Sequence, residues 1–270
     1  MVIDCYETKK INKTIEILQK NDITRIDFFC WTHPHEDHSK GIEKLIKYFK
    51  EETIILLPSE LTLRNINIES KKIYEKLTSL NRNNRKKSGT LMVTSDEKPI
   101  LNKKFLGTNN EVLDIKVIAL APISKNIINQ TKNIETNYND YSIMLLVEID
   151  KHRLLFTGDI ENSTINYIEE HYDSIDNVDY LKLPHHCSTT SNNIFNIIDC
   201  DIDNIVCTTT INKNHNLPCK ELYKDYSEKF KNMFCTSNSY FDNTTTEETG
   251  VIQTKYYLNK NKYENKVIYN

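Results

Sequence analysis

A run of apolar, aromatic and β-branched residues leads directly into a cluster of three histidines and an aspartate. The run, TRIDFFCWT, has few polar breaks, which predicts a strand that is buried on both faces. The cluster is THPHEDHSKG, in which His33, His35, Asp37 and His38 lie within six consecutive positions. Apolar residues then return at helical spacing in GIEKLIKYFKEE, which predicts a helix that begins near Gly41. A unit of strand, loop and helix is typical of α/β folds.

The alternation of β and α segments continues along the chain. We expect strands at 53–58, 114–122, 180–184 and 204–210, helices at 70–80, 162–171 and 192–198, and strand pairs at 141–149 with 152–159 and on either side of a turn at 259–261. Residues 81–110 begin with the basic, aperiodic segment NRNNRKKSGT and are interpreted as an insertion. Because no repeat and no linker is evident, residues 1–270 are expected to form one layered α/β domain.

Composition excludes several classes of protein. With 38% hydrophobic residues, 27% charged residues and a net charge of −3, the chain resembles an ordinary folded protein and gives no global electrostatic case for nucleic acid. No segment approaches the roughly 18 apolar residues that cross a bilayer, and the N-terminus lacks an apolar secretion segment, so we expect a cytoplasmic protein without membrane contact. The seven cysteines include no C-x-x-C pair, which argues against disulfides and a cysteine–zinc site and favours buried thiols.

The histidine cluster has the chemistry of a metal site. Imidazole nitrogens and carboxylate oxygens are ligands that Zn²⁺ prefers. The alternation at positions 33, 35 and 37 lets one loop present two imidazoles in one direction, while Asp37 and His38 point in another. Two neighbouring cations can therefore share the loop; the alternative is a polar loop that is rich in histidine by chance.

Three segments together resemble the metallo-β-lactamase superfamily. THPHEDHSKG resembles its H-x-H-x-D-H motif, LLFTGD the strand that ends in its metal-bridging aspartate, and LKLPHHCSTTS the segment that supplies its last histidine. The amino-acid sequences of these segments, together with NDYS at 139–142, are most similar to the branch that contains the hydrolase domain of the DNA-uptake protein ComEC and related phosphodiesterases. The resemblance covers roughly residues 2 to 240. It implies an αββα four-layer sandwich with mixed sheets.

The resemblance also implies two divalent cations, zinc or alternatively manganese. The implied ligands are His33 and His35 for the first cation, Asp37, His38 and His186 for the second, and Asp159 as the bridge between them. The adjacent His185 would then contact substrate or protonate the leaving group. Which histidine of this pair is the ligand is left open, and for Asp159 alone a helix-capping role is the alternative.

The chain departs from the family pattern in three places. Cys187 stands where many relatives have glycine, which would narrow the pocket, sense oxidation or simply pack as a thiol. No histidine lies between His38 and His152, and His152 is expected at the surface of a hairpin turn. The first cation then lacks a protein ligand, for which Asn139, Asp140 and water are candidates. Relatives begin with two strands before the segment that VIDC resembles, so the sheet is shorter here or the start codon is misplaced.

By this resemblance the reaction is hydrolysis by a hydroxide that bridges the two cations. Asp37 and Asp159 would orient the nucleophile, and His185 or His215 would act as general acid; for His215 a structural role is an equal alternative. A basic cluster could follow phosphates, although a solvated loop is the simpler reading. Its members are Lys71, Lys72, Lys76, Arg82, Arg85, Lys86 and Lys87.

Three functional hypotheses follow. The first is a nuclease or phosphodiesterase, with nucleic acid as a possible substrate. The second is a lipid-headgroup or carboxylic ester hydrolase that uses the same cations. The third is a subunit of a bacterial multi-protein system, such as a defence against phage, that acts when an unidentified protein partner signals. Salt-dependent binding of DNA or RNA would favour the first hypothesis.

Overall fold

The computed structural model describes most of the chain, in two compact units. The described residues are 1–8, 11–59, 61, 66–83, 90–93, 99–106, 112–127, 137–209, 216–236, 250–257 and 262–269. The first unit comprises Met1–Asp96 and Ala119–Met144, and the second comprises Glu97–Ile118 and Leu145–Asn270. The single domain expected for residues 1–270 stays a prediction.

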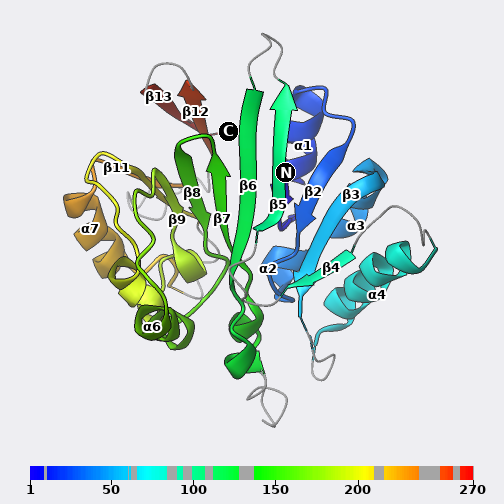
Figure 1. Ribbon diagram of the computed structural model, residues 1–270, viewed down its shortest axis with the longest axis horizontal. Coiled ribbons are helices and arrows are strands. Elements are labelled where there is room, and N and C mark those ends of the chain that lie inside the picture. The colour runs from blue at the N-terminus through cyan, green and yellow to red at the C-terminus, as the bar shows by residue number, and fades with distance from the viewer. Residues whose placement is uncertain are drawn as a thin grey trace. The chain divides into compact units, whose positions relative to one another are not determined.

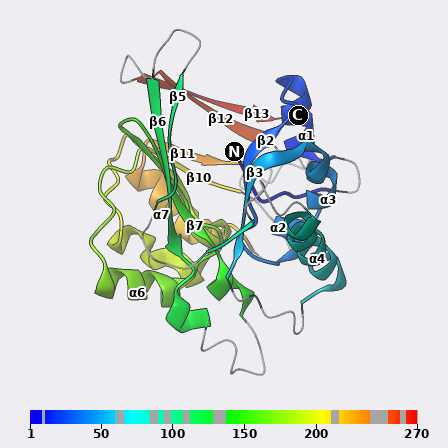
Figure 2. The same cartoon turned by 45° about the vertical axis from the view of Figure 1, so that its right-hand side comes forward.

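The first unit contains a parallel sheet with helices on one side of its central strands (Figure 2). The strand order is β1-β2-β3-β4, and every neighbouring pair is parallel. The strands are β1 (Val2–Ile3), β2 (Ile26–Cys30), β3 (Phe49–Pro58) and β4 (Thr90–Val93). The helices are α1 (Lys13–Lys20), α2 (Glu36–Ser39), α3 (Ile42–Leu45) and α4 (Ile68–Asn83), with 3-10 turns at η1 (Ile46–Tyr48) and η2 (Tyr138–Tyr141).

Strand β2 is buried on both faces, as its apolar run predicts. Phe29 and Trp31 belong to one hydrophobic cluster with residues of β3 and the helices, while Phe28 and Cys30, which alternate with them, are also buried. The cluster's members from the other elements are Leu18, Ile42, Leu45, Ile55, Leu57, Ile73 and Leu77. The core of this unit therefore lies between the sheet and helices α1, α3 and α4.

The helix predicted from Gly41 is much shorter than its apolar spacing suggests. α3 ends at Leu45, η1 follows, and the chain enters β3 at Phe49, which pairs with Ile26 of β2. The pairing of β3 with β2, at Phe49 and again from Ile54, thus overrides the helical pattern of residues 49–52. Gly41 itself is required: its φ is +98°, and a Cβ there would lie 2.6 Å from Asn12 Nδ2 and 2.9 Å from Glu7 Cβ.

The second unit contains a seven-stranded mixed sheet with the order β11-β10-β9-β8-β7-β6-β5 (Figure 1). Strands β8 to β11 are parallel to one another, while β7 with β8 and β5 with β6 are antiparallel. The strands are β5 (Pro99–Leu106), β6 (Val112–Ala121), β7 (Met144–Ile149), β8 (His152–Phe156), β9 (Tyr180–Lys182), β10 (Ile205–Thr208) and β11 (Asn232–Cys235). The predicted α/β class with mixed sheets is therefore confirmed.

The remaining elements of the second unit include the predicted helix at 162–171 and the predicted C-terminal strand pair, together with a helix at 220–229 and a 3-10 turn at 184–186, which were not predicted. They are α6 (Asn162–His171), the 3-10 turns η3 (Pro184–His186) and η4 (Thr189–Asn196), α7 (Lys220–Lys229) and the antiparallel pair β12 (Gly250–Tyr257) and β13 (Lys262–Tyr269). The α-helix predicted at 192–198 is a 3-10 segment instead. Residues 90–93 and 99–106, which fall within the predicted insertion, form the edge strands β4 and β5.

The predicted turn between β7 and β8 is present, but the prediction for His152 was wrong. The two strands pair up to Ile149 and His152, so the turn consists of Asp150 and Lys151. His152 is only 8% exposed, because it is the first residue of β8 and its Nδ1 lies 3.5 Å from Asp179 Oδ2.

Among the described residues, no helix combines the length and apolar character that crossing a membrane requires.

The buried face of α4 provides a test of the first unit's core. Ile73 is 1% exposed and Ile68, on the same helix, is 74% exposed. Ile73→Ala should lower the free energy of unfolding by about 2–5 kcal/mol through lost burial and a cavity, whereas Ile68→Ala should change it by less than about 0.5 kcal/mol. Urea unfolding followed by the fluorescence of Trp31, the single tryptophan, measures both. Equal effects of the two substitutions would contradict this core.

Candidate functional site

In the first unit the histidine cluster begins just after the carboxyl end of β2 and runs into α2. Three side chains brace this loop. Ser70 Oγ on α4 donates to the carbonyl of Pro34 (2.8 Å), Ser39 Oγ donates to that of His35 (2.6 Å), and Trp31 Nε1 donates to Ser39 Oγ (3.1 Å). These hydrogen bonds are buried or partly buried. They fix the backbone of the loop between Trp31 and Ser39, because they join its two ends and hold the carbonyls of Pro34 and His35.

His33 and His35 present two ring nitrogens to one another. His33 Nε2 lies 3.0 Å from His35 Nδ1, and His33 Nδ1 lies 3.0 Å from Thr32 Oγ1. The Thr32 hydroxyl donates its proton to Asp4, so it accepts from His33 Nδ1 and leaves the Nε2 lone pair facing His35. Two nitrogens bound to one tetrahedral zinc would be about 3.3 Å apart. The pair therefore fits a shared cation.

Asp4 orients the next imidazole, a role that we did not predict from the sequence. Asp4 follows β1, whose parallel pairing with β2 places it beside Thr32. Its Oδ2 lies 2.6 Å from His38 Nδ1, and its Oδ1 accepts from the backbone N–H of Thr32 at 2.7 Å. With Nδ1–H engaged, His38 keeps Nε2 as a ligand atom, 3.4 Å from Asp37 Oδ2. Such carboxylate–imidazole pairs commonly support metal ligands.

Both candidates for a further ligand lie in η2 of the same unit. Asn139 and Asp140 are buried, with 5% and 8% exposure. The turn lies beside the histidine loop, because the backbone N–H of Ile143 donates to the carbonyl of Thr32 at 3.1 Å, and the ring centroid of Tyr138 is 6.1 Å from that of His35.

In the second unit, Asp159 and the histidine pair follow neighbouring parallel strands. β8 pairs with β9 in the register Leu154 with Tyr180 and Phe156 with Lys182, so both strands end at the same edge. Thr157 Oγ1 donates to the carbonyl of Lys182 at 2.7 Å and joins the two strand ends. This edge is where side chains of α/β sheets commonly form ligand sites.

His186, rather than His185, faces Asp159. His186 Nε2 lies 3.2 Å from Asp159 Oδ2, and its Nδ1 lies 2.7 Å from Thr209 Oγ1. His185 Nδ1 instead lies 3.2 Å from Glu161 Oε1 and 3.1 Å from Thr190 Oγ1. The separation of the two rings follows from the backbone, since His185, His186 and Cys187 have left-handed φ values of 43°, 52° and 63°. Consecutive residues in this region are strained, which is common at functional sites.

Lys182 is a further member of this group that the sequence analysis did not identify. Its Nζ lies 3.4 Å from Asp159 Oδ1 and donates to the carbonyl of Gly158 at 3.0 Å. Asp159 is only 2% exposed, and a carboxylate buried to that degree requires a counter-charge. Lys182 supplies this charge to one oxygen, which leaves the other oxygen facing His186.

Cys187 behaves as a packed thiol. Its side chain is buried, and this burial raises its pKa to about 12. At neutral pH the sulfur is therefore protonated, and the thiolate that oxidation requires is scarce. All seven cysteines lie in the described part of the chain and are free thiols, as predicted, and five of them are buried.

Several predicted residues are not part of the described structure. His215, Arg85, Lys86 and Lys87 lie outside the described residues, as does the side chain of Arg82. The remaining members of the basic cluster, Lys71, Lys72 and Lys76, are exposed on α4, and Lys76 Nζ pairs with Glu43 at 3.3 Å.

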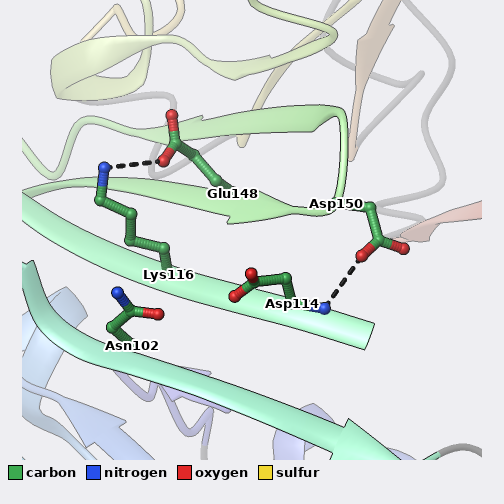
Figure 3. Close-up of a pocket in the computed structure, with 5 residues that line it drawn as sticks. All are labelled: Asn102, Asp114, Lys116, Glu148 and Asp150. Carbon is green, nitrogen blue, oxygen red and sulfur yellow. Dashed lines mark hydrogen bonds and ion pairs between the residues drawn. The ribbon is translucent and has the colours of Figure 1, made fainter. Parts of the chain in front are cut away.

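A separate hollow of about 190 Å³ lies over β5, β6 and β7 of the second unit (Figure 3). It is lined by Asn102, Asp114, Lys116, Glu148 and Asp150. Lys116 pairs with Glu148 at 3.2 Å, and Asp150 accepts from the backbone N–H of Asp114 at 2.9 Å. It contains none of the predicted site residues, and the charges of Lys116 and Glu148 already compensate one another.

The role of Asp4 leads to a prediction about metal affinity. Asp4→Asn should weaken zinc binding about 10–100-fold, because a carboxamide holds His38 Nδ1–H less strongly. The backbone should tolerate it, since asparagine accepts the left-handed φ of 56° at this position. Competition with a chromophoric chelator measures the affinity. Asp27→Asn is the matched control on β2, where Asp27 is exposed and pairs with Arg25; equal affinities of the two variants would refute the role of Asp4.

Comparison with known proteins gives limited likeness. No family model matches the chain, and no curated protein sequence matches it. Among solved structures, a Parabacteroides distasonis protein described as a metal-dependent hydrolase has 15% identity and a TM-score of 0.39, and the match covers 78% of this chain and 76% of the other. A structure described as a new diphosphatase from the PhnP family has 14% identity and a TM-score of 0.39, with 86% and 76% covered.

Proposed function

We propose that this chain is a metal-dependent hydrolase of the metallo-β-lactamase fold that cleaves phosphodiesters. The main support for this proposal is that each unit holds side-chain donor atoms close enough together to bind a cation. His33 Nε2 and His35 Nδ1 face one another at 3.0 Å, and Asp159 Oδ2 faces His186 Nε2 at 3.2 Å. The order of these residues in the chain is the order of the family's ligands, as the H-x-H-x-D-H, TGD and PHH segments imply.

In this proposal the chain binds two divalent cations, zinc or manganese, as the resemblance to the family implies. The residues that would hold the cations are His33, His35, Asp37, His38, Asp159 and His186. Bound cations supply Lewis acidity and lower the pKa of a coordinated water toward neutrality. The nitrogen and carboxylate donors are the set that such cations prefer, and most of these side chains are buried, which excludes competing water.

The chain's own residues have distinct roles in this reaction. Asp4 and Thr32 fix the rings of His38 and His33, so that their ligand nitrogens need no reorganisation. His185 is the proposed general acid. Glu161 accepts from its Nδ1, which leaves Nε2 to hold the proton that the leaving group receives.

A phosphodiester substrate, including DNA or RNA, is proposed from the likeness of the TGD, PHH and NDYS segments to the ComEC-like branch. The exposed lysines Lys71 and Lys72 on α4 agree with an anionic substrate but do not require one. Cleavage of a carboxylic ester in place of a phosphodiester would support the second hypothesis, and activity only with an added protein partner would support the third.

The principal test combines metal analysis with hydrolysis. Wild-type protein should contain up to two divalent cations by mass spectrometry and should hydrolyse bis(p-nitrophenyl) phosphate, single-stranded DNA or RNA. His33→Ala and Asp159→Ala should each lose bound metal and reduce turnover by on the order of 100-fold or more, because a ligand matters at least as much as its supporting residue. His171→Ala is the control, because His171 is not one of the proposed ligands and its ring stacks on that of Tyr167 on α6. Wild-type turnover by His33→Ala would eliminate the proposal.

The general acid gives an independent prediction. His185→Ala should slow cleavage of a dinucleotide about 10²–10⁴-fold, because its alcohol leaving group needs a proton. The same variant should change cleavage of bis(p-nitrophenyl) phosphate little, because nitrophenolate leaves without protonation. Steady-state rates on both substrates measure the difference, and Glu161→Gln should show the same selectivity to a smaller extent. A uniform loss on both substrates would argue for a binding role of His185 instead.

A further inference from the structure

Asn139 has a buried side-chain oxygen without a hydrogen-bond partner. The residue is 5% exposed, and its Oδ1 finds no donor among the residues that the structure describes. An unpaired buried carbonyl costs about 1–3 kcal/mol, and folded proteins keep few of them. Such an atom usually has an ion or an ordered water as its partner.

The hydrogen bonds of the turn account for the backbone N–H and carbonyl of Asn139, but they do not account for its buried side-chain amide. The backbone N–H donates to Asn137 Oδ1 at 3.1 Å, and the backbone carbonyl accepts from the N–H of Ser142 at 2.9 Å. These two bonds complete the 3-10 turn η2 (Tyr138–Tyr141). An asparagine is not needed at this position to form the turn, so its buried amide needs another reason.

The residues on either side of Asn139 contact the histidine loop within the first unit. The ring of Tyr138 lies edge-on to that of His35, with centroids 6.1 Å apart and an interplanar angle of 82°. On the other side, the backbone N–H of Ile143 donates to the carbonyl of Thr32 at 3.1 Å. Residues on both sides of Asn139 in the chain therefore contact the histidine loop, at Thr32 and at His35.

We propose that Oδ1 of Asn139 is the third ligand that the first unit provides to the cation that His33 and His35 bind. The proposal rests on the proposed function, which supplies the cation. Catalytic zinc sites commonly have three protein ligands and one exchangeable position, and within the first unit the two imidazoles provide only two ligands for this cation. Asp140 is the weaker candidate, because it already takes part in other interactions.

This ligand would give the first site a particular chemistry. Two imidazoles and one amide oxygen are neutral donors, so none of the three lowers the charge with which the cation polarises a substrate oxygen. An amide oxygen is also a harder and weaker donor than a third imidazole. The site should thus bind zinc less tightly than a three-histidine site would, and should discriminate less between zinc and manganese.

Metal titration of Asn139 variants tests the assignment. Asn139→Ala should weaken the binding of one of two cations about 10–100-fold and leave the other unchanged. Asn139→Asp, which has the same size and a charged oxygen, should strengthen manganese binding at that site relative to wild type. Competition with chelators, combined with manganese electron paramagnetic resonance, measures both effects without reference to catalysis.

Stability of the metal-free protein separates a ligand from a structural residue. In metal-free protein Asn139→Ala deletes an unpaired acceptor, so the melting temperature should fall by no more than about 2 °C. Zinc should then raise the melting temperature less in the variant than in wild type. A large destabilisation of the metal-free variant, with an unchanged zinc response, would show a structural role and overturn the proposal.

The controls distinguish failure of this inference from failure of the proposed function. Asn204→Ala removes a partly buried asparagine of the second unit, whose Nδ2 donates to the carbonyl of Val178, and it should leave both affinities unchanged. If wild type binds two cations and Asn139→Ala binds them with the same affinities, an ordered water pairs with Oδ1 and only this inference falls. If wild type binds no divalent cation, the proposed function falls and takes this inference with it.

Discussion

Parallel strand pairing is the constraint on which both groups of candidate ligands depend. Parallel neighbours end at the same edge of a sheet, so residues that follow them meet whatever their separation in sequence. β1 and β2 bring Asp4 to Thr32 and His38, and β8 and β9 bring Asp159 to Lys182 and His186. The loops after these strands are short and braced by hydrogen bonds to neighbouring helices and strand ends. Without these pairings, the same side chains would be scattered over polar loops.

Burial of two carboxylates gives these groups their electrostatic character. Asp159 is 2% exposed and the side chain of Asp4 is 13% exposed, and neither position would be tolerated without partners. Asp4 is compensated by a backbone N–H, a hydroxyl and the imidazole of His38, whereas Asp159 is compensated by Lys182 and His186. In both cases the compensating group is itself a candidate ligand or lies beside one. The imidazoles are therefore oriented before any cation binds, which reduces the free-energy cost of organising a metal site.

Prediction from the sequence succeeded where a local pattern coincided with tertiary packing. The apolar run before His33 is a strand buried on both faces, and the segments 114–122, 152–159 and 162–171 contain the expected strands and helix. It failed where a distant partner outweighed the pattern. Residues 49–52 have helical spacing but belong to β3, which pairs with β2 through Phe49 and again from Ile54. His152 follows a turn but is buried beside Asp179. Residues 192–198 have helical spacing but form a 3-10 segment. The physical reason is that short segments have weak intrinsic preferences, which pairing and burial override.

The sequence alone determined which chemical groups are present and in what order: three imidazoles and a carboxylate after a buried strand, then a carboxylate, then two adjacent imidazoles. These follow from residue types and local periodicity, which need no knowledge of distant contacts. Only the tertiary structure decided that His186 rather than His185 faces Asp159, that Asp4 orients His38, that Lys182 neutralises Asp159, and that the oxygen of Asn139 is buried without a partner. Ring direction and hydrogen-bond satisfaction depend on backbone angles and on neighbours that are far away in sequence, so no local pattern encodes them.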